Sequence, residues 1–276
     1  PDLPFAGSLQ DEILVEWQAY SALEKYRTER GLRGHIGLAD AELVTLHDGT
    51  YALIQPRYEG DLTAPPFQSI DTATVRQLVV GVQHLHRAGF VHSDIKEANA
   101  FFRHTKSGAL EVVLSDYGLL RTAGTAHRGG AHGYMPPEVR QYYLPPFSTA
   151  TRDGTFKEDI YALGMMFLPW IGIPAPEDKM NACYNLEFLS PPYWECMGTL
   201  ARELHGTITR RIPAACLPTR LCREAIVADC LDPDPAHRLL AESLMERVNA
   251  VSKAERALPS SPPGSPPHPP LGSPPR

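Results

Sequence analysis

The fold is decided by the stretch His92-Ser93-Asp94-Ile95-Lys96-Glu97-Ala98-Asn99, together with Ser115-Asp116-Tyr117-Gly118 a short distance downstream. Between these two stretches, the apolar runs 100–103 and 110–114 flank a polar turn, which predicts a hairpin. Such a hairpin returns the chain to its starting point. We therefore expect Asp116 to come back toward Asp94, so that the two carboxylates converge.

These residues suit the transfer of a phosphoryl group. Asp94 is placed to accept or orient the proton of an attacking hydroxyl. Asn99 and Asp116 offer a neutral and an anionic oxygen ligand of the kind that Mg²⁺ prefers. Lys96 lies two residues past Asp94, on the same side of an extended loop, where it would steady the transferred phosphate. Single Asp and Asn residues in loops are usually turn formers, so the prediction rests on their joint spacing.

The layout resembles the signature of eukaryotic-type protein kinases, in which a His-Arg-Asp-Leu loop ending in Asn is followed by Asp-Phe-Gly. Further segments resemble that family in the same order. The apolar periodicity of residues 74–86 resembles the long helix before the catalytic loop, and Gly133–Glu138 resembles the Ala-Pro-Glu segment. Asp159 opens an apolar helix and resembles the acid that braces the catalytic loop, while Arg238 resembles the arginine that pairs with Glu138.

This resemblance implies an α+β, bilobal kinase-like fold. We expect a partial N-terminal lobe at residues 1–57, a mainly helical C-terminal lobe at residues 58–257, and a disordered Pro/Ser-rich tail at residues 258–276. In that tail Ser261, Ser265 and Ser273 each precede proline. A phosphorylation-dependent or proline-motif partner is the alternative to a merely solvated tail.

The N-terminal lobe would supply the nucleotide site. The helix expected at residues 11–26 resembles the family's regulatory helix and places Glu16 where a phosphate-binding lysine would be paired; the alternative is a solvent-facing acid. Residues 42–46 and 51–55 flank an Asp-Gly turn and predict a hairpin that leads into a hinge. On this alignment Ile54 is the gatekeeper, and the backbone groups of Gln55 and Arg57 bind adenine.

Several positions depart from the family pattern. Ser93 replaces the arginine through which activation-loop phosphorylation reaches the catalytic aspartate, so that switch would be lacking. Tyr117 replaces phenylalanine, and Ala131 stands where serine/threonine kinases usually have threonine. The sequence also lacks a glycine-rich loop and a Val-Ala-Ile-Lys strand, and it begins at Pro1 rather than Met, so we expect an N-terminally truncated domain.

The resemblance implies a serine/threonine protein kinase that uses ATP and Mg²⁺ and phosphorylates a protein hydroxyl. In it Asp94 is the base, Lys96 contacts the γ-phosphate, and Asn99 and Asp116 ligate the metal. Lys96 favours serine/threonine over tyrosine specificity. The alternative is a catalytically inactive pseudokinase that acts as a binding or scaffolding module. A small-molecule kinase of the same fold is a weaker option, because residues 134–138 resemble a peptide-substrate segment.

Composition agrees with this prediction. The chain has 276 residues, 43% of them hydrophobic, which is enough for a sizeable core. A net charge of −6 gives no sign of a nucleic-acid partner, and there is no apolar run of the length that a membrane span needs. Five cysteines without a Cys-x-x-Cys pair argue against a disulfide framework and a zinc site, so we expect an intracellular protein.

Overall fold

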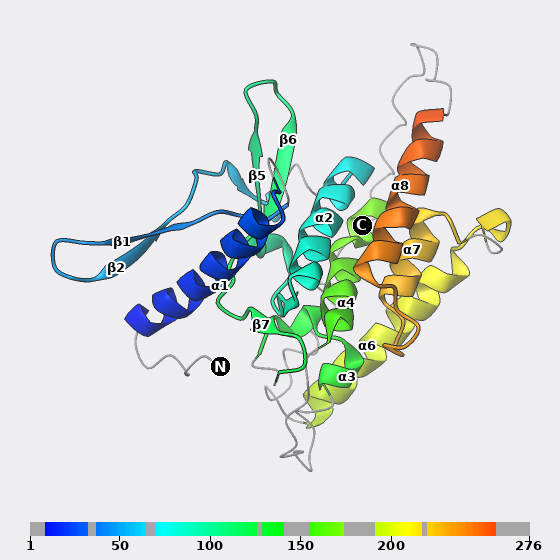
Figure 1. Ribbon diagram of the computed structural model, residues 1–276. Coiled ribbons are helices and arrows are strands. Elements are labelled where there is room, and N and C mark those ends of the chain that lie inside the picture. Colours follow the sequence, from blue (N-terminus) through cyan, green and yellow to red (C-terminus); the bar gives the residue numbers. More distant parts are fainter. Residues whose placement is uncertain are drawn as a thin grey trace, which may run out of the picture.

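The computed structural model describes residues 9–32, 37–64, 70–125, 129–140, 155–173, 191–216 and 220–257. Figure 1 shows a helix and two β-hairpins on one side of the molecule, and a packed group of helices on the other. The predicted α+β, kinase-like arrangement is therefore confirmed. The predicted tail at residues 258–276 lies outside the described residues.

The N-terminal part contains helix α1 (Leu9–Glu29) and a hairpin of strands β1 (Glu42–Thr45) and β2 (Tyr51–Ile54). The strands pair antiparallel with Glu42 opposite Ile54, around the predicted turn, in which Asp48 accepts the Thr50 backbone N–H at 3.0 Å. Gln10 of α1 accepts the backbone N–H of Tyr51 at 2.6 Å, which ties the hairpin to the helix. Beyond that contact the hairpin projects away from the helical part (Figure 1).

The second predicted hairpin connects the catalytic loop to Asp116. Strands β5 (Ala100–His104) and β6 (Leu110–Leu114) pair antiparallel, and the short strand β3 (Gly60–Asp61) adds to the β5 edge. Residue Leu38 bridges to Leu114 beside this sheet. That bridge requires two glycines, because a Cβ on Gly81 would lie 2.4 Å from the carbonyl oxygen of Gly37. The close approach holds the segment before β1 between helix α2 and the sheet.

The helical part is organised around α2 (Thr72–Arg87) and α4 (Phe156–Met166). Asp71 caps α2 by accepting the Thr74 backbone N–H at 2.7 Å. Buried residues of α2 recur at helical spacing and α4 is buried along almost its whole length, so both helices belong to the core. Fully burying one Leu or Val side chain contributes about 1.5–3 kcal/mol. Around them lie α6 (Pro191–Arg210), α7 (Arg223–Cys230) and α8 (Ala241–Ala257).

Short elements lie between these helices and shape the site. They are strands β4 (Phe90–Val91) and β7 (Arg121–Thr122), helix α3 (Pro137–Arg140), and the 3₁₀ turns η2 (Glu97–Asn99), η3 (His132–Tyr134), η5 (Leu168–Ile171) and η6 (Ala214–Cys216). The apolar stretch 160–173 is interrupted where α4 ends and η5 begins, and Gly172 closes η5 in the left-handed region at φ 66°.

Two expectations made from composition can be compared with the structure. None of the described helices is both long and apolar enough to span a bilayer. Cys216, Cys222 and Cys230 form no disulfide bond, whereas Cys196 is disulfide-bonded, so the expectation drawn from the cysteine pattern fails at Cys196.

Candidate active site

The carboxylate of Asp94 is the centre of a compact polar cluster. The Asp94 Oδ2 atom accepts Lys96 Nζ at 2.6 Å and Asn99 Nδ2 at 2.9 Å. Oδ1 accepts the backbone N–H of Ala131 at 2.8 Å. The side chain of Asp94 is only 10% exposed, so these three donors replace water as its main partners. They fix one orientation of a buried carboxylate, as a positioned base requires.

The loop that carries Asp94 is held from below by Asp159 of α4. This carboxylate accepts the backbone N–H groups of His92 at 2.9 Å and Ser93 at 3.0 Å, and the ring Nε2–H of His86 at 2.9 Å. Burial alone would raise the pKa of Asp159, but the hydrogen bonds and charges of His86 and His92 outweigh burial and lower it. Asp159 therefore braces the catalytic loop, as the sequence predicted.

The catalytic loop is also joined to the segment that carries Asp116. His92 Nε2 donates to the Ser115 carbonyl at 3.1 Å, and the Ser115 backbone N–H donates to the Asn99 carbonyl at 2.9 Å. These bonds place the backbone of Asp116 beside the loop. Asp116 itself adopts a left-handed backbone at φ 63°, which is uncommon for a residue other than glycine.

On the other side, Asp116 and its neighbours face helix α1. Glu16 accepts the backbone N–H of Tyr117, and burial, followed by the negative charge of Asp116, raises the pKa of Glu16. The ring of Tyr117 is completely buried and lies 4.7 Å from that of Tyr20, centroid to centroid. The Tyr117 hydroxyl donates to the Leu114 carbonyl at 2.8 Å, so the extra polar group is satisfied. Glu16 is thus part of the site and not a solvent-facing acid.

The residues assigned to the hinge do not form a closed adenine site among the described residues. Ile54 is 54% exposed, so its side chain does not line a covered pocket. Gln55 turns its side chain inward, donating to the Tyr20 hydroxyl and to Ser115 Oγ. Arg57 is exposed. The gatekeeper and adenine-binding assignments stay predictions, and the side-chain role of Gln55 was missed, because sequence register alone does not show what covers a strand.

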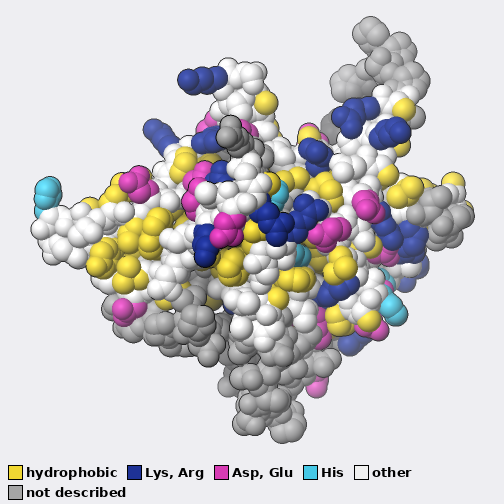
Figure 2. All heavy atoms as spheres, in the orientation of Figure 1, with side chains coloured by type: hydrophobic (Ala, Val, Ile, Leu, Met, Phe, Trp, Pro, Cys, Tyr) yellow, Lys and Arg dark blue, Asp and Glu magenta, His cyan; other side chains and the backbone are white. Residues whose placement is uncertain are grey.

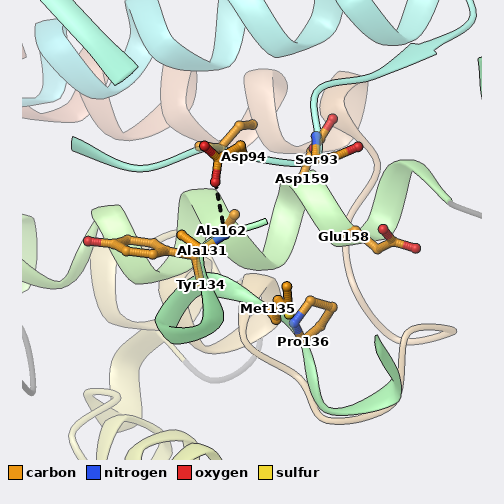
Figure 3. A pocket seen from close by; sticks show the side chains of 10 residues that line it. Ser93, Asp94, Ala131, Tyr134, Met135, Pro136, Glu158, Asp159 and Ala162 are labelled. Atoms are coloured by element: carbon orange, nitrogen blue, oxygen red, sulfur yellow. Dashed lines mark hydrogen bonds between the residues drawn. The ribbon is translucent and has the colours of Figure 1, made fainter. Parts of the chain in front are cut away.

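The segment after Tyr117 returns to Asp94 from the opposite side. Figure 3 shows Ala131 bonded to Asp94, with Tyr134, Met135 and Pro136 lining the same small cavity. Gly130 makes this approach possible: it has φ 141°, and a Cβ there would lie 2.4 Å from the Ser93 carbonyl oxygen. The sequence interpretation treated Ala131 as the loss of a hydroxyl and missed that its backbone N–H binds Asp94.

The predicted long-range ion pair is present. Arg238 donates through both terminal nitrogens to Glu138, at 2.5 and 2.6 Å. The two side chains are 0% and 13% exposed, and the guanidinium carbon lies 5.0 Å from the ring centroid of Tyr161 in α4. This confirms the alignment of the C-terminal third, and α4 lies over the pair through Tyr161.

Asn99 and Asp116 carry side-chain oxygens of the kind that a hard divalent cation prefers. Asn99 uses its amide nitrogen on Asp94, so its oxygen remains available as a ligand, and Asp116 forms no ion pair with another described residue. Within the described ranges no group of three or more His, Cys, Asp and Glu residues could hold a metal by itself.

Fold and site together resemble the large lobe of a protein kinase, with a loop that Asp159 braces from below. The sequence profile of the protein kinase domain matches residues 68–248, which is more than half of the chain. The chain belongs to the protein kinase domain family.

Individual relatives agree. The chain is 27% identical over 220 residues to "Light-sensor Protein kinase" of Ceratodon purpureus, covering 71% of this chain and 15% of that protein. It is 37% identical over 148 residues to "Serine/threonine-protein kinase/endoribonuclease IRE2" of Homo sapiens, covering 50% and 15%. It is 29% identical over 188 residues to "Serine/threonine-protein kinase WNG2" of Toxoplasma gondii, covering 66% and 32%. The chain thus spans no more than about a third of the length of these relatives.

Proposed function

We propose that the protein is an ATP- and Mg²⁺-dependent serine/threonine protein kinase. The observation that carries this proposal is the buried Asp94 carboxylate, which is oriented by Lys96, Asn99 and the Ala131 N–H. Most of the catalysis of phosphoryl transfer comes from positioning and electrostatic stabilisation, so a rigid carboxylate beside a cation and an amide is the arrangement this reaction needs.

Each polar residue takes one role in the proposed reaction. Asp94 orients the substrate hydroxyl and receives its proton as the oxygen attacks the γ-phosphorus of ATP, while the bond from that phosphorus to the β–γ bridging oxygen breaks and ADP leaves. Lys96 lies within ion-pair distance of Asp94 and is placed to stabilise charge on the transferred group. Asn99 and Asp116 would hold Mg²⁺, which when bound neutralises charge on the phosphate oxygens. Membership of the protein kinase domain family supports a protein hydroxyl as the acceptor and ATP as the donor.

One observation favours the second candidate, a pseudokinase that binds or scaffolds without turnover. Ser93 and Ala131 stand at positions where an active kinase usually has arginine and threonine. The arginine links activation-loop phosphorylation to the catalytic aspartate, and the threonine supports the catalytic residues with a hydrogen bond. A chain without these two side chains keeps the loop but has fewer of the contacts that support turnover.

The test compares Asp94→Asn with Asp116→Asn, using ³²P transfer to a basic protein substrate and thermal shift with Mg·ATP. Asp94→Asn should lower transfer by about 10²–10⁴-fold and leave the Mg·ATP shift nearly unchanged. Asp116→Asn should lose both transfer and shift, because it removes the anionic metal ligand.

Asp48→Asn, in the exposed turn of the first hairpin, is the control and should retain both signals. Background transfer from the wild type and both site variants, with no Mg·ATP-dependent shift in any of them, would reject the kinase proposal in favour of the pseudokinase.

A further inference from the structure

A buried arginine lies directly beneath the catalytic loop, at a position that the sequence motifs did not single out. Arg121 of β7 is 6% exposed as a residue. Its Nε donates to Ser93 Oγ at 2.9 Å, and its Nη2 pairs with Glu158 Oε2 at 2.5 Å. The side chains of Arg121 and Glu158 are only 5% and 4% exposed. Water therefore screens this ion pair very little.

The partner of Arg121 is itself fixed. Glu158 lies in the first turn of α4, where its other oxygen accepts the Thr155 backbone N–H at 3.1 Å. The next residue is Asp159, which holds the backbone of His92 and Ser93. The start of α4 thus presents two adjacent carboxylates. One binds the catalytic loop, and the other binds the strand that leads away from Asp116.

Ser93 is the meeting point of these contacts. Its backbone is in the left-handed region at φ 73°, which is costly for serine and is held by the bond to Asp159. Its hydroxyl accepts from Arg121, and its carbonyl lies against Gly130. The segment between Asp116 and Glu138 is therefore fastened to the catalytic loop near both ends, by Arg121 at one and by Gly130 and Ala131 at the other.

In kinases that are switched by phosphorylation, a phosphate added to the activation segment supplies an anion that pairs with arginine and orders the segment. Here the guanidinium comes from the segment itself and its anion is the built-in carboxylate of Glu158. We propose that Arg121 is a positioning residue. Its buried pair with Glu158 keeps the activation segment, here residues 118–125 and 129–136, assembled on the catalytic loop without phosphorylation. The expected effect on kcat rests on the proposed function, whereas the expected effect on amide exchange does not.

The test measures amide hydrogen exchange by mass spectrometry on full-length, phosphatase-treated protein. The wild type should protect the peptides that cover residues 118–125 and 129–136. Glu158→Gln and Arg121→Met should each speed exchange there by about tenfold or more, while α8 exchanges as in the wild type. Glu242→Gln breaks the exposed Arg87–Glu242 pair, whose side chains are 46% and 48% exposed, and should leave the segment unchanged.

A double variant separates positioning from a general role in folding. Arg121→Met with Glu158→Gln leaves no unpaired buried charge, and the glutamine can still accept the Thr155 N–H, so its melting temperature should recover toward the wild type. Its activation segment should stay fast-exchanging, because Ser93 has still lost its donor. In transfer assays kcat should fall by about tenfold with KM for ATP within about twofold.

Two results would overturn the proposal. In the first, single variants exchange like the wild type in these peptides. In the second, the unphosphorylated wild type is unprotected there and becomes protected only after phosphorylation. Amide exchange is measured independently of phosphate transfer. If the protein transfers no phosphate but shows the expected exchange, the kinase function is rejected and the role of Arg121 is retained.

Discussion

Replacing Arg238 by methionine should destabilise the protein strongly, and the structure gives the size of the effect. Arg238 pairs through two hydrogen bonds with Glu138 and also donates Nε to the Asp232 carbonyl at 2.7 Å. Methionine keeps much of the packing against Tyr161 but leaves the Glu138 carboxylate buried without its cation. Breaking a buried pair from one side costs about 3–5 kcal/mol. Total stability is only about 5–15 kcal/mol, so the loss is a large fraction of it.

Urea denaturation followed by circular dichroism measures this loss directly, and thermal melting gives a second estimate. For a domain of this size, about 3–5 kcal/mol corresponds to a fall in Tm of about 6–20 °C. The control is Arg87→Met, which breaks the half-exposed pair with Glu242 and should cost less than about 1 kcal/mol. If Arg238→Met loses no more stability than Arg87→Met, the assignment of a buried structural pair is wrong.

The remaining predictions concern Glu16 and Gly130. Burial and the charge of Asp116 raise the pKa of Glu16, so its ionisation disfavours the ligand-free fold: Glu16→Gln should raise Tm by about 1–2 °C near neutral pH. Below the ordinary pKa of about 4.3, Glu16 is protonated in both the folded and the unfolded protein, so the gain in Tm should vanish there. The gain should appear as pH rises toward the raised pKa of Glu16 in the folded protein. A gain in Tm that stays unchanged from about pH 4 to pH 8 would contradict this. Gly130→Ala should loosen the contact with Asp94 and cost about 2 kcal/mol or more. Gly124→Ala should cost about 1–2 kcal/mol, because Gly124 also has a positive φ, of 85° against 141° for Gly130, but no neighbour within 4 Å. Chemical denaturation compares the two glycine variants, and equal losses would show that the approach to Ser93 is not tight.

Much of the fold could be predicted because its signals are local. The Asp-Gly turn at residues 48–49 fixed the register of the first hairpin, and the apolar spacing of residues 74–86 marked a helix that the structure extends to 72–87. The pair of Glu138 with Arg238 was also predictable, although 100 residues separate its members, because both stand in recognisable segments.

Other contacts could not be predicted, for physical reasons. The bond from Ala131 to Asp94 uses a backbone N–H, which every residue except proline carries, so residue type contains no signal for it. Ile54 stands in a strand as expected, but its 54% exposure depends on what packs over the hairpin, and alternation along one strand does not encode that. The inward turn of Gln55 likewise depends on Tyr20 and Ser115, which are distant in sequence.

The pair of Arg121 with Glu158 shows how a departure from a motif can mislead when it is interpreted alone. Ser93, taken by itself, indicates a lost arginine and a lost switch. In the structure an arginine reaches Ser93 from β7 and carries its own carboxylate partner from α4. The sequence did contain a usable signal, because Arg121 follows an apolar run and Glu158 precedes the bracing aspartate, two positions where a charge is costly unless it is paired. In our proposal Arg121 compensates for the arginine that is missing at position 93, and the amide exchange of residues 118–125 measures that compensation.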